Sequence, residues 1–123
     1  MAVTLYTVTP FASLRTIEDT AANATSEDDV LTGIATVYKI VINNAANSAA
    51  SFLKLYNNVA PTVGTTAPDG IIKVSAGDTR TIIIPKGWSF PTALSFACVT
   101  AGGTAGITGP ASAVNVKILA TAA

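Results

Sequence analysis

Residues with the chemistry to build a site are few in this chain. The 123 residues include no histidine and a single cysteine, Cys98. Histidine is the commonest general base and metal ligand, and a lone thiol lacks both an imidazole to activate it and a second thiol to bind zinc. We therefore expect Cys98, which lies in an apolar alternating run, to be a small buried hydrophobic residue.

The carboxylates do not form a recognisable site either. Glu27, Asp28 and Asp29 are adjacent, but the segment lacks the alternating oxygens and the glycine of a calcium loop, so a solvated charge cluster is favoured. Asp69 and Asp78 stand beside glycines, where turn formation explains them. No two acids are placed as a glycosidase pair. We expect no catalytic residue, no metal ion and no cofactor, and hence not an enzyme.

Two other stretches invite a binding role. Residues 101–110 are rich in glycine, but no lysine stands at the phosphate-binding position and no helix pattern follows. We interpret them as a loop, either mobile or laid against a partner. Trp88 follows Lys86-Gly87, where an indole either stacks on a sugar or seals the end of a core or a subunit interface. The same two interpretations apply to Tyr38 and Tyr56.

The elements that must position these residues are short strands. Turn residues separate apolar runs rich in Ile, Val, Leu, Phe and Thr. The expected strands are residues 35–43, 51–56, 71–74, 79–84, 94–100 and 111–120. Such spacing is typical of antiparallel sheets. The sequence predicts an all-β, jelly-roll-like antiparallel sandwich of seven or eight strands, with an N-terminal extended arm and at most one short helix.

The sequence also predicts how these strands connect. We expect residues 35–43 and 51–56 to form a hairpin-like pair, and residues 71–74 to pair with residues 79–84. The long loop 57–69 has the length of a crossing between the two sheets. Pro85-Lys86-Gly87 is expected to end the strand that begins at Thr79.

The N-terminal part differs from the rest in charge. Residues 1–30 contain one arginine and five acidic residues, whereas residues 31–123 contain six basic residues and two aspartates. We divide the chain into an arm and acidic head, residues 1–34, and a sandwich body, residues 35–123. Residues 2–9 alternate as a first strand or as an arm that adds to a neighbour's sheet. Residues 13–25 are the only segment expected to form a helix, of one or two turns.

The composition indicates assembly with other protein. Hydrophobic residues make up 50% of the chain and charged residues only 11%, against roughly 25% in soluble domains. No charged residue occurs between Gly87 and Val116, yet prolines and glycines interrupt this span, which argues against a membrane segment. The net charge of zero argues against nucleic acid as a partner. The start of the chain has no secretory signal pattern, so we expect synthesis in a cytoplasm.

Five segments follow one another along the body, and they are Lys54–Tyr56, Ala60–Pro68, Ile72–Thr79, Pro85–Phe90 and Leu94–Thr100. Through this succession the body, from Tyr38 to Leu119, resembles small virion proteins of tailed bacteriophages. In these, a strand ending in Lys-x-Tyr leads through a Pro-Thr-x-Gly-Thr loop and a glycine-containing turn to a glycine with an aromatic residue and a Leu-Ser-x-Ala-x-Thr strand. The resemblance implies a capsid decoration (cement) protein, or a neck or fibre-associated module, that is typically a homotrimer.

Composition and resemblance together give one functional expectation. It is a non-enzymatic virion protein, made in the host cytoplasm, that decorates the capsid surface and binds itself and the major capsid protein. The interface candidates are Leu5, Tyr6, Val8, Trp88, Phe90 and Ile107. The alternative is a receptor- or carbohydrate-binding module at a fibre, and the missing signal pattern disfavours a third option, a bacterial surface or pilus-like subunit.

Overall fold

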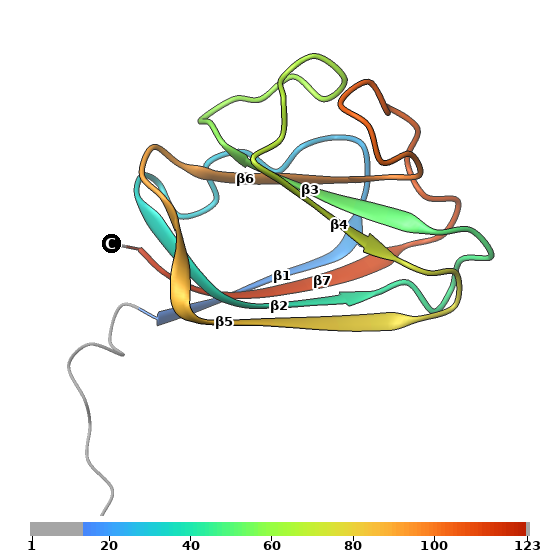
Figure 1. Ribbon diagram of the computed structural model, residues 1–123, viewed down its shortest axis with the longest axis horizontal. Helices are drawn as coiled ribbons and strands as arrows, with labels where there is room; N and C mark the ends of the chain where they lie inside the picture. Colours follow the sequence, from blue (N-terminus) through green and yellow to red (C-terminus); the bar gives the residue numbers. More distant parts are fainter. Residues whose placement is uncertain (1–13, 123) are drawn as a thin grey trace, which may run out of the picture.

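The computed structural model describes residues 14–122, and these form two facing layers of antiparallel strands (Figure 1). The strands in chain order are β1 (Leu14–Ala22), β2 (Ala35–Asn43), β3 (Ser51–Asn57), β4 (Gly70–Val74), β5 (Thr79–Phe90), β6 (Leu94–Val99) and β7 (Val114–Thr121). Sheet A has the order β1-β7-β2-β5 and sheet B the order β4-β3-β6. The predicted all-β antiparallel sandwich with seven strands is confirmed. The jelly-roll arrangement stays a prediction, and residues 2–9, predicted as a first strand or an extended arm, lie outside the described residues.

The core lies between the two sheets and follows from strand alternation. On β7, Val114, Val116, Ile118 and Ala120 are fully buried, while the residues between them face outward. The other buried core side chains come from both sheets; they include Val37, Ile40, Ile42, Leu53, Leu55, Leu94, Phe96 and Cys98. Burying a large aliphatic or aromatic side chain contributes about 1.5–3 kcal/mol, so this layer stabilises the fold.

The segment predicted to be helical is strand β1. The helix prediction was wrong. The i, i+3 spacing of Leu14 and Ile17 would place both residues on one face of a helix, but it places them on opposite faces of a strand. Ile17 packs toward the core and Leu14 lies on the outer face of sheet A. β1 pairs with β7 from Leu14 opposite Thr121 to Ala22 opposite Val114. These ladder bonds satisfy the backbone, and the β-branched residues Thr16, Ile17 and Thr20 suit a pleated surface.

The connections between strands also differ from expectation. β2 and β3 do not pair, because they belong to different sheets, and the same is true of β4 and β5. The loop 57–69 does not cross between sheets but joins β3 to its neighbour β4. The sequence favoured hairpins because a short polar turn joins β2 to β3 and another joins β4 to β5. In the structure both turns connect one sheet to the other.

A buried asparagine holds the two crossing turns together. The Asn44 side-chain amide donates to the carbonyl oxygens of Ala49 at 3.0 Å and Ser75 at 3.2 Å. Its Oδ1 accepts from Ser51 Oγ at 2.8 Å and from Asn47 Nδ2 at 2.9 Å. Asn44 is fully buried, so each of these bonds replaces one lost to water. The corner therefore depends on a hydrogen-bond network that hydrophobic spacing does not encode.

Strand β5 runs past the expected stop at Pro85–Gly87 and continues to Phe90. The register slips here, since Val37 pairs with Trp88 but Lys39 pairs with Ile83. Pro85 is tolerated because β5 is an edge strand of sheet A. The slip also shifts the faces of β2: Val37, Ile40 and Ile42 all point inward, and Tyr38 points outward. Strict alternation along residues 35–43 predicts Tyr38 on the same face as Ile40 and Ile42, and the slip makes that prediction wrong.

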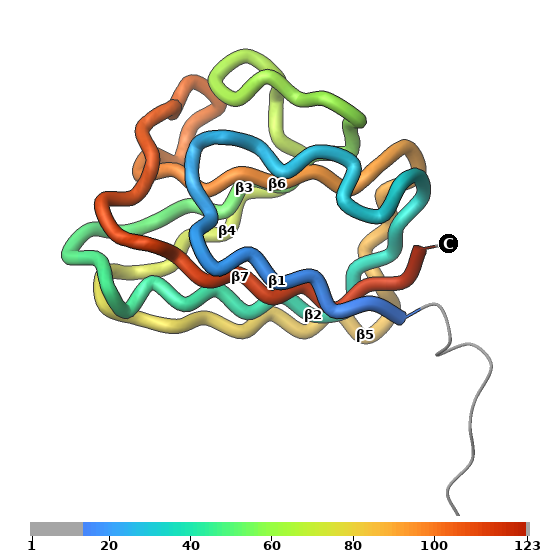
Figure 2. Tube along the Cα trace, turned by 180° about the vertical axis from the view of Figure 1, so that it is seen from behind, coloured from blue at the N-terminus to red at the C-terminus, as the bar shows by residue number. Residues whose placement is uncertain are grey.

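The described part of the acidic segment, residues 14–34, lies within the sandwich. After β1, residues 23–30 run beside β6, as the tube in Figure 2 shows. Glu27 N donates to Phe96 O at 2.9 Å, Val30 N to Leu94 O at 3.0 Å, and Cys98 N to Asn23 O at 2.8 Å. This irregular segment covers the edge of β6, and so protects it from pairing with other chains.

Candidate functional site

The outer face of sheet B is covered by the protein's own loops. Segments 57–69 and 100–113 lie above this sheet in Figure 1. Beneath them Lys54, on β3, is fully buried, and its Nζ donates to the carbonyl oxygens of Thr104 at 3.2 Å and Gly106 at 3.0 Å. Burial lowers the pKa of the Lys54 ammonium below its ordinary value. The glycine-rich loop is therefore held against its own sheet by a lysine, and its carbonyl groups point toward a cation.

Tyr56 is the second unusual residue on this covered face. Its side chain is fully buried, and its hydroxyl has no hydrogen-bond partner among residues 14–122. Burial raises the pKa of this hydroxyl. The neighbouring strand position is Ser95, whose Oγ donates to Asn58 O at 2.6 Å. Tyr56 thus fills space between sheet and loop, and its ring offers no surface on which a sugar can stack.

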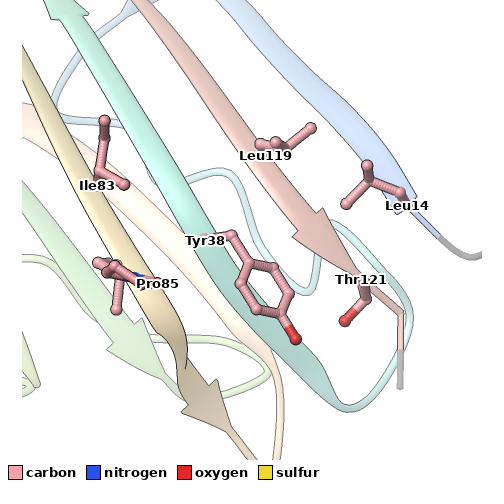
Figure 3. A pocket seen from close by; sticks show the side chains of 7 residues that line it. Leu14, Tyr38, Ile83, Pro85, Leu119 and Thr121 are labelled. Atoms are coloured by element: carbon pink, nitrogen blue, oxygen red, sulfur yellow. The ribbon is translucent and has the colours of Figure 1, made fainter. Parts of the chain in front are cut away.

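The outer face of sheet A, in contrast, carries an open apolar hollow, which we call the sheet A groove. Its volume is about 390 Å³. All four strands of the sheet contribute to its lining, which consists of Leu14, Tyr38, Ile83, Ile84, Pro85, Leu119 and Thr121 (Figure 3). No charged side chain is among these residues. Ile83 in particular is 67% exposed, which is high for a large aliphatic residue on a strand.

The register slip between β2 and β5 shapes this groove. It turns Tyr38 to the outer face, against a backbone that bends at Pro85–Gly87. Gly87 has φ +80°, and a β-carbon there would clash with Thr36 Cγ2 and lie only 3.1 Å from Tyr38 Cε1. Only glycine both adopts this backbone conformation easily and leaves room for the tyrosine ring. The groove is thus a consequence of local backbone irregularity.

Charged groups lie beyond one end of the groove on the same face. A smaller hollow of about 160 Å³ is lined by Thr16, Lys39, Val41, Lys117, Ile118 and Leu119. Lys117 Nζ is 3.3 Å from Glu18 Oε2, and both side chains are about half exposed. Such an exposed pair contributes little to stability, about 0–1 kcal/mol. The face therefore has an apolar half next to a charged half, a pattern suited to a defined docking register.

The structure places the predicted interface residues in three different settings. Trp88 is half-buried; a β-carbon at Gly70 would clash with its ring, and the ring centroid is 4.8 Å from that of Phe90. Phe90 is fully buried, so it is a core residue with no surface to offer a partner. Ile107 is 65% exposed on the loop above sheet B. Leu5, Tyr6 and Val8 lie outside the described residues.

The other residues considered for chemistry are accounted for by the fold. Cys98 is buried, and burial is the main reason that the pKa of its thiol rises to about 11. Asp29 Oδ1 accepts from Gly33 N at 2.8 Å, and Asp69 Oδ2 accepts from Asn57 N at 2.6 Å. Residues 14–122 contain no group of three or more His, Cys, Asp or Glu residues that could hold a metal ion. Asp29 and Asp69 therefore accept hydrogen bonds that stabilise the backbone of their own turn or loop.

Apart from Tyr38, the groove residues were missed by sequence reasoning, although a partial signal existed. Both faces of residues 35–43 are largely apolar, and Ile83 shares a face with Thr79 and Thr81. An isoleucine on the polar face of an edge strand indicates that something covers that face. The contribution of Leu14 was hidden, because its segment was expected to be a helix.

Comparison with known proteins adds no identification. Neither the models of protein families nor the curated protein sequences give a match to this chain. Within residues 14–122 no helix has the length and apolar character that crossing a bilayer requires.

Proposed function

We propose that this protein is a non-enzymatic structural protein of a bacteriophage virion, which decorates the capsid and stabilises it by repeated protein–protein contacts. The observation that carries the proposal is the uncharged, open groove across all four strands of sheet A. Its exposed isoleucine and uncharged lining are features of a surface that another protein covers. The motif resemblance of the body to small phage virion proteins supplies the virion context.

The way such a protein would act follows from interface area. Apolar burial of about 25 cal/mol per Å² is offset by the cost of immobilising the partners, so one modest contact binds weakly. An oligomer that presents several copies of a contact to a regular lattice binds much more tightly, because each later contact is intramolecular. We therefore assign the groove to self-association, as a homotrimer, with the major capsid protein as the lattice partner.

The decisive experiment adds purified protein to capsid shells that lack it. The proposal expects saturable binding at a fixed copy number per shell, together with greater resistance of the shells to heat. Ile83→Lys should reduce both self-association and shell binding, because it places a charge in the groove. Val59→Lys is the matched control, since Val59 is 53% exposed on the loop above sheet B. Absence of saturable binding by the unmodified protein would refute the proposal.

The receptor- or carbohydrate-binding alternative has less support from the geometry. It required Trp88, Tyr38 and Tyr56 as a sugar platform, but Tyr56 is fully buried and the Trp88 ring packs over Gly70. A glycan array would reveal this function directly. Hits that disappear in a Trp88→Ala variant would favour it over capsid decoration.

A further inference from the structure

The sheet A groove borders the point at which the N-terminal segment joins the fold. Leu14 is both the first residue of β1 and part of the groove lining. It pairs with Thr121, which also lines the groove. Thirteen residues precede Leu14 in the sequence. A segment of this chain therefore begins at the edge of the apolar hollow.

The composition of that segment matches the groove. Residues 1–13, MAVTLYTVTPFAS, contain no charged side chain but carry Val3, Leu5, Tyr6, Val8 and Phe11. The groove lining likewise contains no charged side chain. Leaving several large apolar side chains in water is unfavourable by about 1.5–3 kcal/mol each, compared with burying them. Segment and groove thus have the same requirement, which is contact with an uncharged apolar surface.

The direction of β1 decides which copy of the segment fits. β1 enters sheet A at the end where β7 finishes, because Leu14 pairs with Thr121. A chain that continued the line of β1 backward would leave its own sheet at that end. The groove runs across the strands from Leu14 to Pro85, so the segment would have to turn sharply onto the outer face within the few residues before Leu14 to enter its own groove. A segment arriving from another molecule needs no such turn. Ten extended residues reach about 33 Å, whereas four neighbouring strands span only about 14 Å.

We propose that residues 2–11 of one copy occupy the sheet A groove of a second copy, so that the oligomer is held by exchanged arms. This inference rests on the proposed function, because it names the contact through which the decorating oligomer would form. Exchange of one segment between identical chains closes a symmetric ring when every copy both gives and receives an arm. Tyr38, Ile83 and Leu119 would then be covered by the apolar side chains of the arm.

Site-directed disulfide formation tests the exchange. Two proteins are made in a Cys98→Ala background, one with Leu5→Cys and one with Ile83→Cys, and are mixed under mild oxidation. The inference expects a mixed disulfide dimer to become the main product on a non-reducing gel. Pairing Leu5→Cys with Val59→Cys instead, a similarly exposed position on the other side of the sandwich, should lose that product.

A protein with both Leu5→Cys and Ile83→Cys separates the two possible origins of the arm. Cross-linked oligomers support exchange, whereas a disulfide confined to one chain means that the groove holds its own arm and overturns the inference. Absence of any disulfide in both formats also overturns it. Saturable shell binding by the unmodified protein in either of these cases would leave the proposed function standing and remove the exchanged arm alone.

Discussion

Replacing Tyr56 by phenylalanine deletes one oxygen atom at a site where that atom makes no hydrogen bond within the described chain. Tyr56 is fully buried on β3 of sheet B, and its hydroxyl has no partner among residues 14–122. An unpaired buried hydroxyl costs about 1–3 kcal/mol, because folding removes it from water without compensation. Tyr56→Phe should therefore raise the free energy of unfolding, whereas most core substitutions lower it.

The expected gain is about 1 kcal/mol, because the small void left by the oxygen offsets part of the relieved cost. For a domain of this size, 1 kcal/mol corresponds to a rise in Tm of about 3–5 °C. The gain also depends on pH. Burial raises the pKa of the Tyr56 hydroxyl above its ordinary 10.0, so the folded state keeps a proton that the unfolded state loses. The parent protein is therefore destabilised as the pH rises above 10, and the advantage of Tyr56→Phe should widen there.

Urea unfolding at pH 7, 9 and 10.5, compared between the parent and the variant, measures both effects. Cys98 and Lys54 also titrate in alkali, but they are present in both proteins and cancel in the difference. Tyr38→Phe is the control, since Tyr38 lies half-buried in the open sheet A groove, and it should change stability by less than about 0.5 kcal/mol. A loss of more than about 1 kcal/mol in Tyr56→Phe would show that the hydroxyl donates a hydrogen bond, which refutes this reasoning.

Three further predictions address the loop anchor, the thiol and the backbone bend. Lys54→Met should speed amide exchange in the loop 101–110, because it removes the two hydrogen bonds from Lys54 Nζ. Burial lowers the Lys54 pKa below its ordinary 10.5, so the folded parent binds fewer protons than its unfolded state. The parent should therefore gain stability relative to Lys54→Met in urea titrations as the pH rises from 7 toward 10. Cys98 should resist maleimide until urea unfolds the protein, since a pKa raised from 9.0 to about 11 makes its thiolate about 100-fold rarer; labelling as fast as a free thiol would contradict its burial. Gly87→Ala should lower the free energy of unfolding by about 2–4 kcal/mol, because of the positive φ and the clash with Thr36. Gly77→Ala is the control, since Gly77 has φ +70° but no atom within 4 Å, and it should lower the free energy of unfolding by only about 1 kcal/mol. Equal losses of stability in thermal unfolding would exclude the clash.

The strands of the body were predictable because their alternation is strong. In residues 114–120, buried and outward-facing positions alternate strictly. The strand ranges 35–43 and 71–74 were predicted to within one residue. Hydrophobic period and turn residues are local properties, so a single sequence contains them. The absence of a helix in the described chain agrees with the predicted class. The seven-stranded sandwich follows from these features.

Which strands pair could not be predicted in the same way. The turn after β2 contains Asn44, and nothing in the local sequence reveals that its amide will bridge the carbonyl oxygens of Ala49 and Ser75. That network sends the chain from one sheet to the other at two turns that look like hairpins. The strand β1 was missed for a related reason, because its stability comes from pairing with β7, about a hundred residues away in the sequence. Long-range contacts override weak local propensity.

The candidate site arises from a difference between the two outer faces. Loops 57–69 and 100–113 cover sheet B, and the fully buried Lys54 anchors one of them. The uncharged residues 101–110 therefore cover part of sheet B with their inner side, while Ile107 stays exposed on the outer side. On sheet A no described loop plays this role, and the groove with Ile83 stays open. The low charge of the chain thus has two physical origins: self-coverage on one face, and on the other a surface that, in our proposal, a second copy covers. In our proposal the second surface is the one that serves assembly, which is why the proposed tests of function centre on position 83.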